Sequence, residues 1–184
     1  IKMKHSFIIV LLLTSLFCKA QTFLFCEKQV NQINYSQITI PDAKVFFKSI
    51  PKLKESHFES KALSGVPGSY SDLLIVSYKR EGVNFRFIKG NTPGYVSEEY
   101  VLRTITINKK SPNVVSCDGL HVGDVVTLGE LGLTANDYIR DLTMKAKYGG
   151  FMKNGVKYSV VITTKGKLTE SSHLKIKQII LDLR

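Results

Sequence analysis

The sequence lacks the short motifs that most catalytic sites require. It has no His-Glu-x-x-His, no Cys-x-x-Cys, no Gly-x-Ser-x-Gly turn, and no glycine-rich loop with the lysine of a phosphate site. Only 15 acidic residues accompany 26 lysines and arginines, so any glycosidase-like carboxylate pair would be arbitrary. His121 and Asp124 could form a base and its orienting group, and the alternative is a turn histidine beside a capping aspartate. We therefore predict a protein that is not an enzyme and uses no metal or cofactor.

Long apolar runs are also scarce, and the one present lies at the start of the sequence. Ser6 to Phe17 is apolar apart from Ser and Thr, follows a basic start, and is shorter than the roughly 20 residues of a membrane span. Small residues at Cys18 and Ala20, before Gln21, complete the layout of a secretory signal peptide. We predict that residues 1–20 are a signal peptide cleaved after Ala20, and that the protein is periplasmic or secreted. The ending Lys-Ala-Gln resembles signal peptides of the Bacteroidota. An uncleaved anchor and a lipoprotein attached through Cys18 are the alternatives.

Cysteine is rare, with three in the whole chain. Cys26 and Cys117 remain after the predicted cleavage, and a pair of cysteines in an oxidising compartment readily forms a disulfide. Such a bridge would tie the N-terminal lead-in to the start of the second half of the chain. It would contribute about 4 kcal/mol in the chain-entropy description. Two unrelated buried thiols are the alternative.

The apolar periodicity predicts an α+β fold. Helical spacing predicts short helices after Asp42 and after Asp124, over 43–49 and 125–131, and a further short helix that Thr134 would cap. Residues 54–72 are predicted to be a loop. Alternating apolar residues predict strands over 73–79, 83–88, 100–107, 144–152, 156–164 and 174–183. Asn154-Gly155 predicts a tight hairpin, and a change of apolar parity predicts a β-bulge near Gln178.

The two halves of the chain repeat one order of apolar residues. Tyr78, Gly82, Val83, Phe85 and Phe87 match Phe151, Gly155, Val156, Tyr158 and Val160 at an offset of 73, and Leu102, Ile105 and Ile107 match Ile176, Ile179 and Leu181 at an offset of 74. After a lead-in over 21–37, we therefore predict tandem repeats over 38–110 and 114–184. Each would pack a short helix or helical hairpin on an antiparallel sheet of three to four strands. The alternative is a single α+β domain whose strands merely look alike.

This arrangement resembles a known family of binding proteins. Helix-on-sheet units used in tandem resemble the β-lactamase-inhibitor-protein fold. The segment Gly119-Leu-His-Val-Gly-Asp124 is similar to the one that opens the helix in small exported bacterial modules, including relatives of the outer-membrane assembly lipoprotein BamE. The resemblance implies binding or inhibition of another protein rather than catalysis.

Positive charge is the strongest functional indication. The formal net charge is +11 and falls to +8 when the signal peptide removes its three lysines. A lysine cluster surrounds the predicted second-half hairpin. Its members are Lys145, Lys147, Lys153, Lys157, Lys175 and Lys177. If neighbouring strands pair as predicted, Lys157, Lys175 and Lys177 share one face, which would attract an anionic partner. Solvated lysines that protect edge strands are the alternative.

These patterns together predict a non-catalytic, exported binding module. Its sheet face would engage a protein or an anionic envelope component, without nucleic acid and without a transmembrane span after signal cleavage. The alternatives are an envelope assembly or structural accessory protein and a small secreted hydrolase.

Overall fold

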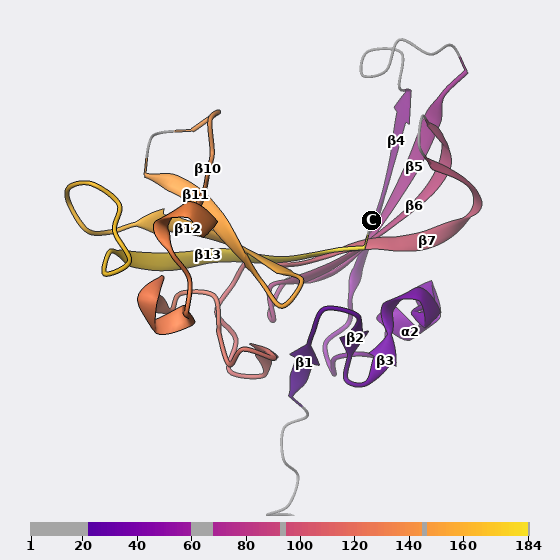
Figure 1. The fold of residues 1–184 in the computed structure, drawn as a ribbon. Coiled ribbons are helices and arrows are strands. Elements are labelled where there is room, and N and C mark those ends of the chain that lie inside the picture. Colours follow the sequence, from indigo (N-terminus) through magenta and orange to yellow (C-terminus); the bar gives the residue numbers. More distant parts are fainter. Residues whose placement is uncertain (1–21, 60–67, 93–94, 145–146, 184) are drawn as a thin grey trace, which may run out of the picture.

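The computed structural model describes residues 22–59, 68–92, 95–144 and 147–183, and strands dominate it (Figure 1). A nine-stranded antiparallel sheet has the order β10-β11-β12-β13-β7-β6-β5-β4, with β9 paired to β13. Its strands in chain order are β4 (Lys52–Glu59), β5 (Tyr70–Tyr78), β6 (Val83–Thr92), β7 (Tyr95–Ile107), β9 (Val125–Thr127), β10 (Ile139–Arg140), β11 (Tyr148–Lys153), β12 (Val156–Ile162) and β13 (His173–Asp182).

A smaller four-stranded sheet is made by the lead-in and by the middle of the chain. Its strands are β1 (Phe23–Phe25), β2 (Gln29–Val30), β3 (Ile33–Asn34) and β8 (Val114–Ser116). β1 pairs with β2 in antiparallel and with β8 in parallel orientation. The predicted lead-in is therefore extended, and its first strand is joined to residues almost one hundred positions later in the chain.

The α+β prediction is wrong, because the described chain contains almost no helix. Its helical elements are α2 (Ile40–Ala43) and the 3-10 turns η1 (Tyr35–Gln37), η3 (Gly129–Leu131) and η4 (Ala135–Asp137). The predicted helix over 43–49 stops early because the Tyr78 hydroxyl donates to the Ala43 carbonyl over 2.8 Å. Phe46 and Phe47 then turn into the core, where Phe46 stacks on Phe85 with ring centroids 5.2 Å apart. Aromatic burial thus replaces further helical turns.

The predicted helix over 125–131 is a strand followed by a 3-10 turn. Val125 pairs with Lys175 of β13, and β-branched residues favour this extended pairing. The glycine predicted to end the helix does end η3, since Gly132 has a φ of 69°. Thr134 caps η4 as predicted, although only three residues follow it in helical form.

The turn and bulge predictions are confirmed, and one loop prediction is wrong. Asn154 and Gly155 have φ angles of 45° and 72°, as a type I′ hairpin requires. The β12–β13 register shifts between Ser159 and Val160, which leaves Lys177 as the extra residue of a bulge. Residues 52–59, partly inside the predicted loop, form the edge strand β4 against β5.

The hydrophobic core covers one face of the long sheet. Figure 1 shows β1, β2, β3 and α2 on one side of it. The side chains that point to this covered face are almost completely buried. They include Val76, Tyr78, Val83, Phe85, Phe87, Ile105, Ile107, Phe151, Tyr158, Val160, Leu174, Ile176, Ile179 and Leu181. Because side chains alternate along a strand, the residues between them face the other way.

The two halves of the long sheet have matching registers about the β7–β13 pair. Phe85 pairs with Ile105 and Tyr158 pairs with Ile179, which are the positions aligned by the sequence repeat. The sequence match of Tyr78 with Phe151 is not reproduced in the strand pairing. Tyr78 pairs with Val83, next to the turn, whereas Phe151 pairs with Tyr158, further from its turn. At the centre, Thr106 pairs with Ile180, its own counterpart at an offset of 74. This pairing has the pattern of a twofold axis through the sheet. The duplication itself stays a prediction.

Candidate functional site

The candidate site is the face of the long sheet that points away from the core, here called the open face. Residues that pair across neighbouring strands form rows of side chains on this face. One row consists of Lys52, Ser77, Asn84, Thr106, Ile180, Lys157 and Met152. Its members are polar, basic or aliphatic, whereas the matching positions on the covered face are apolar and buried. This face can therefore contact another molecule without unfolding the core.

Three of the predicted lysines meet on the open face. Lys157 pairs with Ile180, and Lys175 pairs with Val161. Lys177 is the bulged residue, and a bulge of this kind places its two residues on roughly the same side of the sheet, so Lys177 lies beside Gln178. All three lysines are exposed. They present a concentrated positive charge on two neighbouring strands.

The other predicted lysines are placed differently. Lys153 is half-buried, and its ammonium donates to the Leu131 carbonyl over 2.6 Å, so it links the β11–β12 hairpin to the end of η3. Lys147 is exposed immediately before β11, and its carbonyl accepts from the Ile162 amide over 2.8 Å. Lys145 lies outside the described residues.

The sequence interpretation missed the basic residues that the first half adds to the open face. Lys54 and Arg86 flank Ile75 on neighbouring strands, and Lys52 is the partner of Ser77. The alternation of Val83, Phe85 and Phe87 in the sequence is a signal that could have placed Arg86 on the outer face, but the two lysines lay in or beside a predicted loop. The nearby carboxylates of Glu55 and Asp72 are at covered-face positions, opposite Leu74 and Lys89. Asp182, at the end of β13, lies on the open face opposite Thr104.

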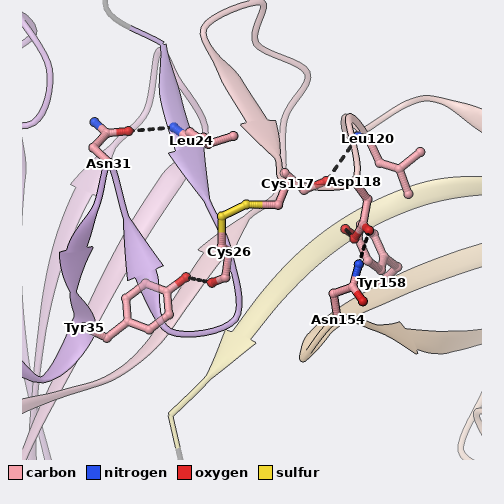
Figure 2. Close-up of a disulfide and its surroundings, with 10 residues drawn as sticks. Leu24, Cys26, Asn31, Tyr35, Cys117, Asp118, Leu120, Asn154 and Tyr158 are labelled. Carbon is pink, nitrogen blue, oxygen red and sulfur yellow. Dashed lines mark hydrogen bonds between the residues drawn. A yellow bond between two sulfur atoms is a disulfide. The ribbon is translucent and has the colours of Figure 1, made fainter.

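A disulfide links the two segments that follow β1 and β8 of the small sheet. Cys26 and Cys117, the pair singled out from the sequence, are bonded with Cα atoms 5.2 Å apart (Figure 2). Their neighbour Asp118 accepts from the Tyr158 hydroxyl over 2.8 Å and from the Asn154 amide over 2.6 Å. Burial raises the pKa of Tyr158, which keeps its hydroxyl a donor. The disulfide and these hydrogen bonds join the small sheet to the β11–β12 hairpin.

His121 and Asp124 lie side by side in the turn before β9. The carboxylate of Asp124 accepts from the His121 backbone amide over 2.7 Å, and its oxygen lies 3.4 Å from His121 Nδ1. The Gly123 amide donates to the Ile176 carbonyl over 2.9 Å, so the turn is tied to β13. In the described part of the chain, no group of three or more His, Cys, Asp or Glu side chains is placed to hold a metal ion.

A hollow of about 510 Å³ lies between the η1–α2 segment and β7. Lys89 reaches it, with its ammonium 3.8 Å from the Asp72 carboxylate and 5.0 Å from the centre of the Tyr100 ring. Burial is the largest cause of the raised pKa of Tyr100. Glu98 and Glu99 also line the hollow, but neither His121 nor His173 does. It therefore lacks a histidine base among its described walls.

Comparison with protein families, with characterised proteins and with solved structures finds no match. The resemblance to the β-lactamase-inhibitor-protein fold and to BamE-like modules stays a prediction. Within the described ranges, no helix has the length and apolar character needed to span a bilayer. The disulfide fits an oxidising, extracellular environment.

Proposed function

We propose that this protein is a non-catalytic, exported binding module that engages an anionic partner through the open face of its long sheet. The observation that carries the proposal is the uneven distribution of charge between the two faces of that sheet. Lys52, Lys54, Arg86, Lys157, Lys175 and Lys177 are all exposed on the open face. The predicted leader over 1–20 and the disulfide support export.

The geometry favours binding because the lysines are held by a rigid support. β13 lies at the centre of the sheet, and Lys157, Lys175 and Lys177 project from it and from its neighbour β12. Several like charges on a fixed surface sum their fields, which raises the local concentration of an anion and speeds its association. Among exposed residues that field is screened by salt over a Debye length of about 10 Å at 0.1 M.

Retention on immobilised dextran sulfate tests the proposal. The variant K157Q/K175Q/K177Q should elute at much lower salt than the unmodified protein. The matched control K28Q/K44Q/K48Q loses the same charge from exposed positions in the N-terminal segment. It should shift much less, because its lysines lie away from the open face. Equal shifts for the two variants would show that only net charge matters and would refute the proposal.

A further inference from the structure

Large apolar side chains are exposed at the β10 edge of the long sheet. Leu142 is 89% exposed, Met144 60%, Ile139 56% and Met152 46%. These four residues, here called the apolar rim, lie on the edge strand β10, the turn after it, and β11. Exposed apolar side chains that gather in one place commonly mark an interaction site.

Strand pairing places the apolar rim beside the lysines. Ile139 pairs with Gly150, which pairs with Ser159 of the open face. Met152 pairs with Lys157, so an exposed methionine and an exposed lysine are direct neighbours. Ile139 and Met152 therefore lie on the same face as Lys157 and Lys175, and Leu142 and Met144 follow Ile139 in the turn at this edge of the sheet.

The turn that carries Leu142 is held by hydrogen bonds. Asp141 accepts from the Thr143 amide over 2.9 Å and from the Thr143 hydroxyl over 2.7 Å, and its own amide donates to the Tyr148 carbonyl over 3.0 Å. These bonds hold the turn at the sheet edge while Leu142 projects into solvent. The hydrogen bonds from Thr143 are also the largest causes of the lowered pKa of Asp141, and Lys157 lowers it further.

Apolar side chains next to lysines match the chemistry of a bilayer surface. Aliphatic and thioether side chains enter the boundary between headgroups and acyl chains, while lysine stems lie along it and their ammonium groups reach lipid phosphates. A soluble polyanion would use the lysines but leave Leu142 and Met144 in water. Val125 adds to the same surface, because it is 53% exposed and pairs with Lys175.

We infer that the anionic partner is a lipid surface, on which the apolar rim inserts while Lys157, Lys175 and Lys177 contact the headgroups. This inference rests on the proposed function and names its partner. It describes a protein that lies on a membrane and leaves its sheet intact.

The absence of tryptophan gives a direct test, because one introduced indole reports its own surroundings. The protein used is the chain from Gln21, so that the apolar run before it does not contribute. Leu142→Trp should show a blue-shifted emission with phosphatidylglycerol vesicles and no shift with dextran sulfate. Ile50→Trp is the control, since Ile50 is 96% exposed but lies in the N-terminal segment, and its emission should not shift. Unchanged Leu142→Trp emission in vesicles would overturn the inference.

Vesicle co-sedimentation separates the inference from the function on which it rests. L142S/M144S should bind phosphatidylglycerol vesicles about tenfold or more weakly, yet keep its retention on dextran sulfate. V45S/I50S is the matched control and should bind normally, because its exposed side chains lie elsewhere. K157Q/K175Q/K177Q should lose vesicle binding by on the order of a hundredfold and lose dextran sulfate retention as well.

Other outcomes would overturn the lipid assignment. If the unmodified protein is retained on dextran sulfate through its lysines but does not bind the vesicles, the proposed function stands and the partner is an acidic protein or glycan. If the protein is a dimer that L142S/M144S converts to a monomer, without any vesicle binding, the rim contacts a second copy of the chain. Sedimentation velocity measures that change.

Discussion

Arg103 in β7 and Lys177 in β13 occupy equivalent β-bulges. The β6–β7 register shifts between Arg86 and Phe87, and the β12–β13 register shifts between Ser159 and Val160. Each shift leaves one extra basic residue, and the two are separated by the same offset of 74 that relates the strands. The bulges lie on either side of the Thr106–Ile180 pair at the centre of the sheet.

Deleting Lys177 should destabilise the protein far more than Lys177→Ala. Without the extra residue, the N-terminal half of β13 slips by one position and turns Leu174 and Ile176, both fully buried, toward the open face. Losing the burial of two such side chains costs roughly 3–6 kcal/mol. The exposed Lys177→Ala change should remain within about 0.5 kcal/mol. Urea unfolding monitored by circular dichroism measures both, and equal stabilities would contradict the role given to the bulge.

Removing the disulfide should weaken the fold without changing the open face. Cys26 and Cys117 are 91 positions apart, so their bond constrains a long loop in the unfolded chain. The variant C26S/C117S should lose about 4 kcal/mol of unfolding free energy. The unmodified protein should show the same loss when a reductant is added to the urea titration, and the variant should not respond to it. An unmodified protein with the same urea midpoint in the presence and absence of reductant would contradict this prediction.

The Tyr158 hydroxyl should contribute measurably to stability. Tyr158→Phe removes its hydrogen bond to Asp118 and leaves that carboxylate with the Asn154 amide, at a cost of about 1 kcal/mol. In a double-mutant cycle with Asp118→Ala, which removes the accepting oxygens, the two losses should be less than additive because the residues interact directly. Strictly additive losses would show that the hydrogen bond contributes nothing.

Stability should fall in acid because carboxylates cap the short turns. Hydrogen bonds from Thr39 lower the pKa of Asp42 below its usual 3.8, and those from Thr134 do the same for Asp137. A lowered folded-state pKa gives stability that is present above the unfolded value and is lost as pH falls through the folded value. Urea midpoints should therefore drop below about pH 4. D42N/D137N should show a smaller drop between pH 6 and pH 3.

Local chemistry in the sequence predicted the Asn154-Gly155 turn, the cap at Thr134 and the β-bulge. Asn154-Gly155 adopts the left-handed angles of its hairpin because few other residue pairs accept them. Thr134 caps its turn, and Gly132 ends the preceding one. Along β13 the apolar residues change from even-numbered to odd-numbered positions. Both sets can be buried on the same face only if the strand contains a bulge. The placement of Lys157 and Lys175 follows from the same alternation.

The predicted helices failed where tertiary contacts competed with local preference. Val125 has helical apolar spacing with Leu128, yet it pairs with Lys175 from a strand fifty residues later. Ala43 could have continued a helix, but the Tyr78 hydroxyl takes its carbonyl. Edge strand β4 has few apolar residues, so no periodicity marked it as a strand. Its pairing with β5 was visible only in the fold.

The sequence by itself determined which residues turn, which alternate, and which two cysteines can bond, because these properties depend on neighbours within a few positions or on side-chain chemistry alone. Only the tertiary structure decided that both halves join into one sheet with a bare face, and that Met152 and Ile139 lie beside Lys157. Strand pairing brings together residues that are distant in the chain, and a periodic pattern records which face a side chain takes but never which strand becomes its neighbour.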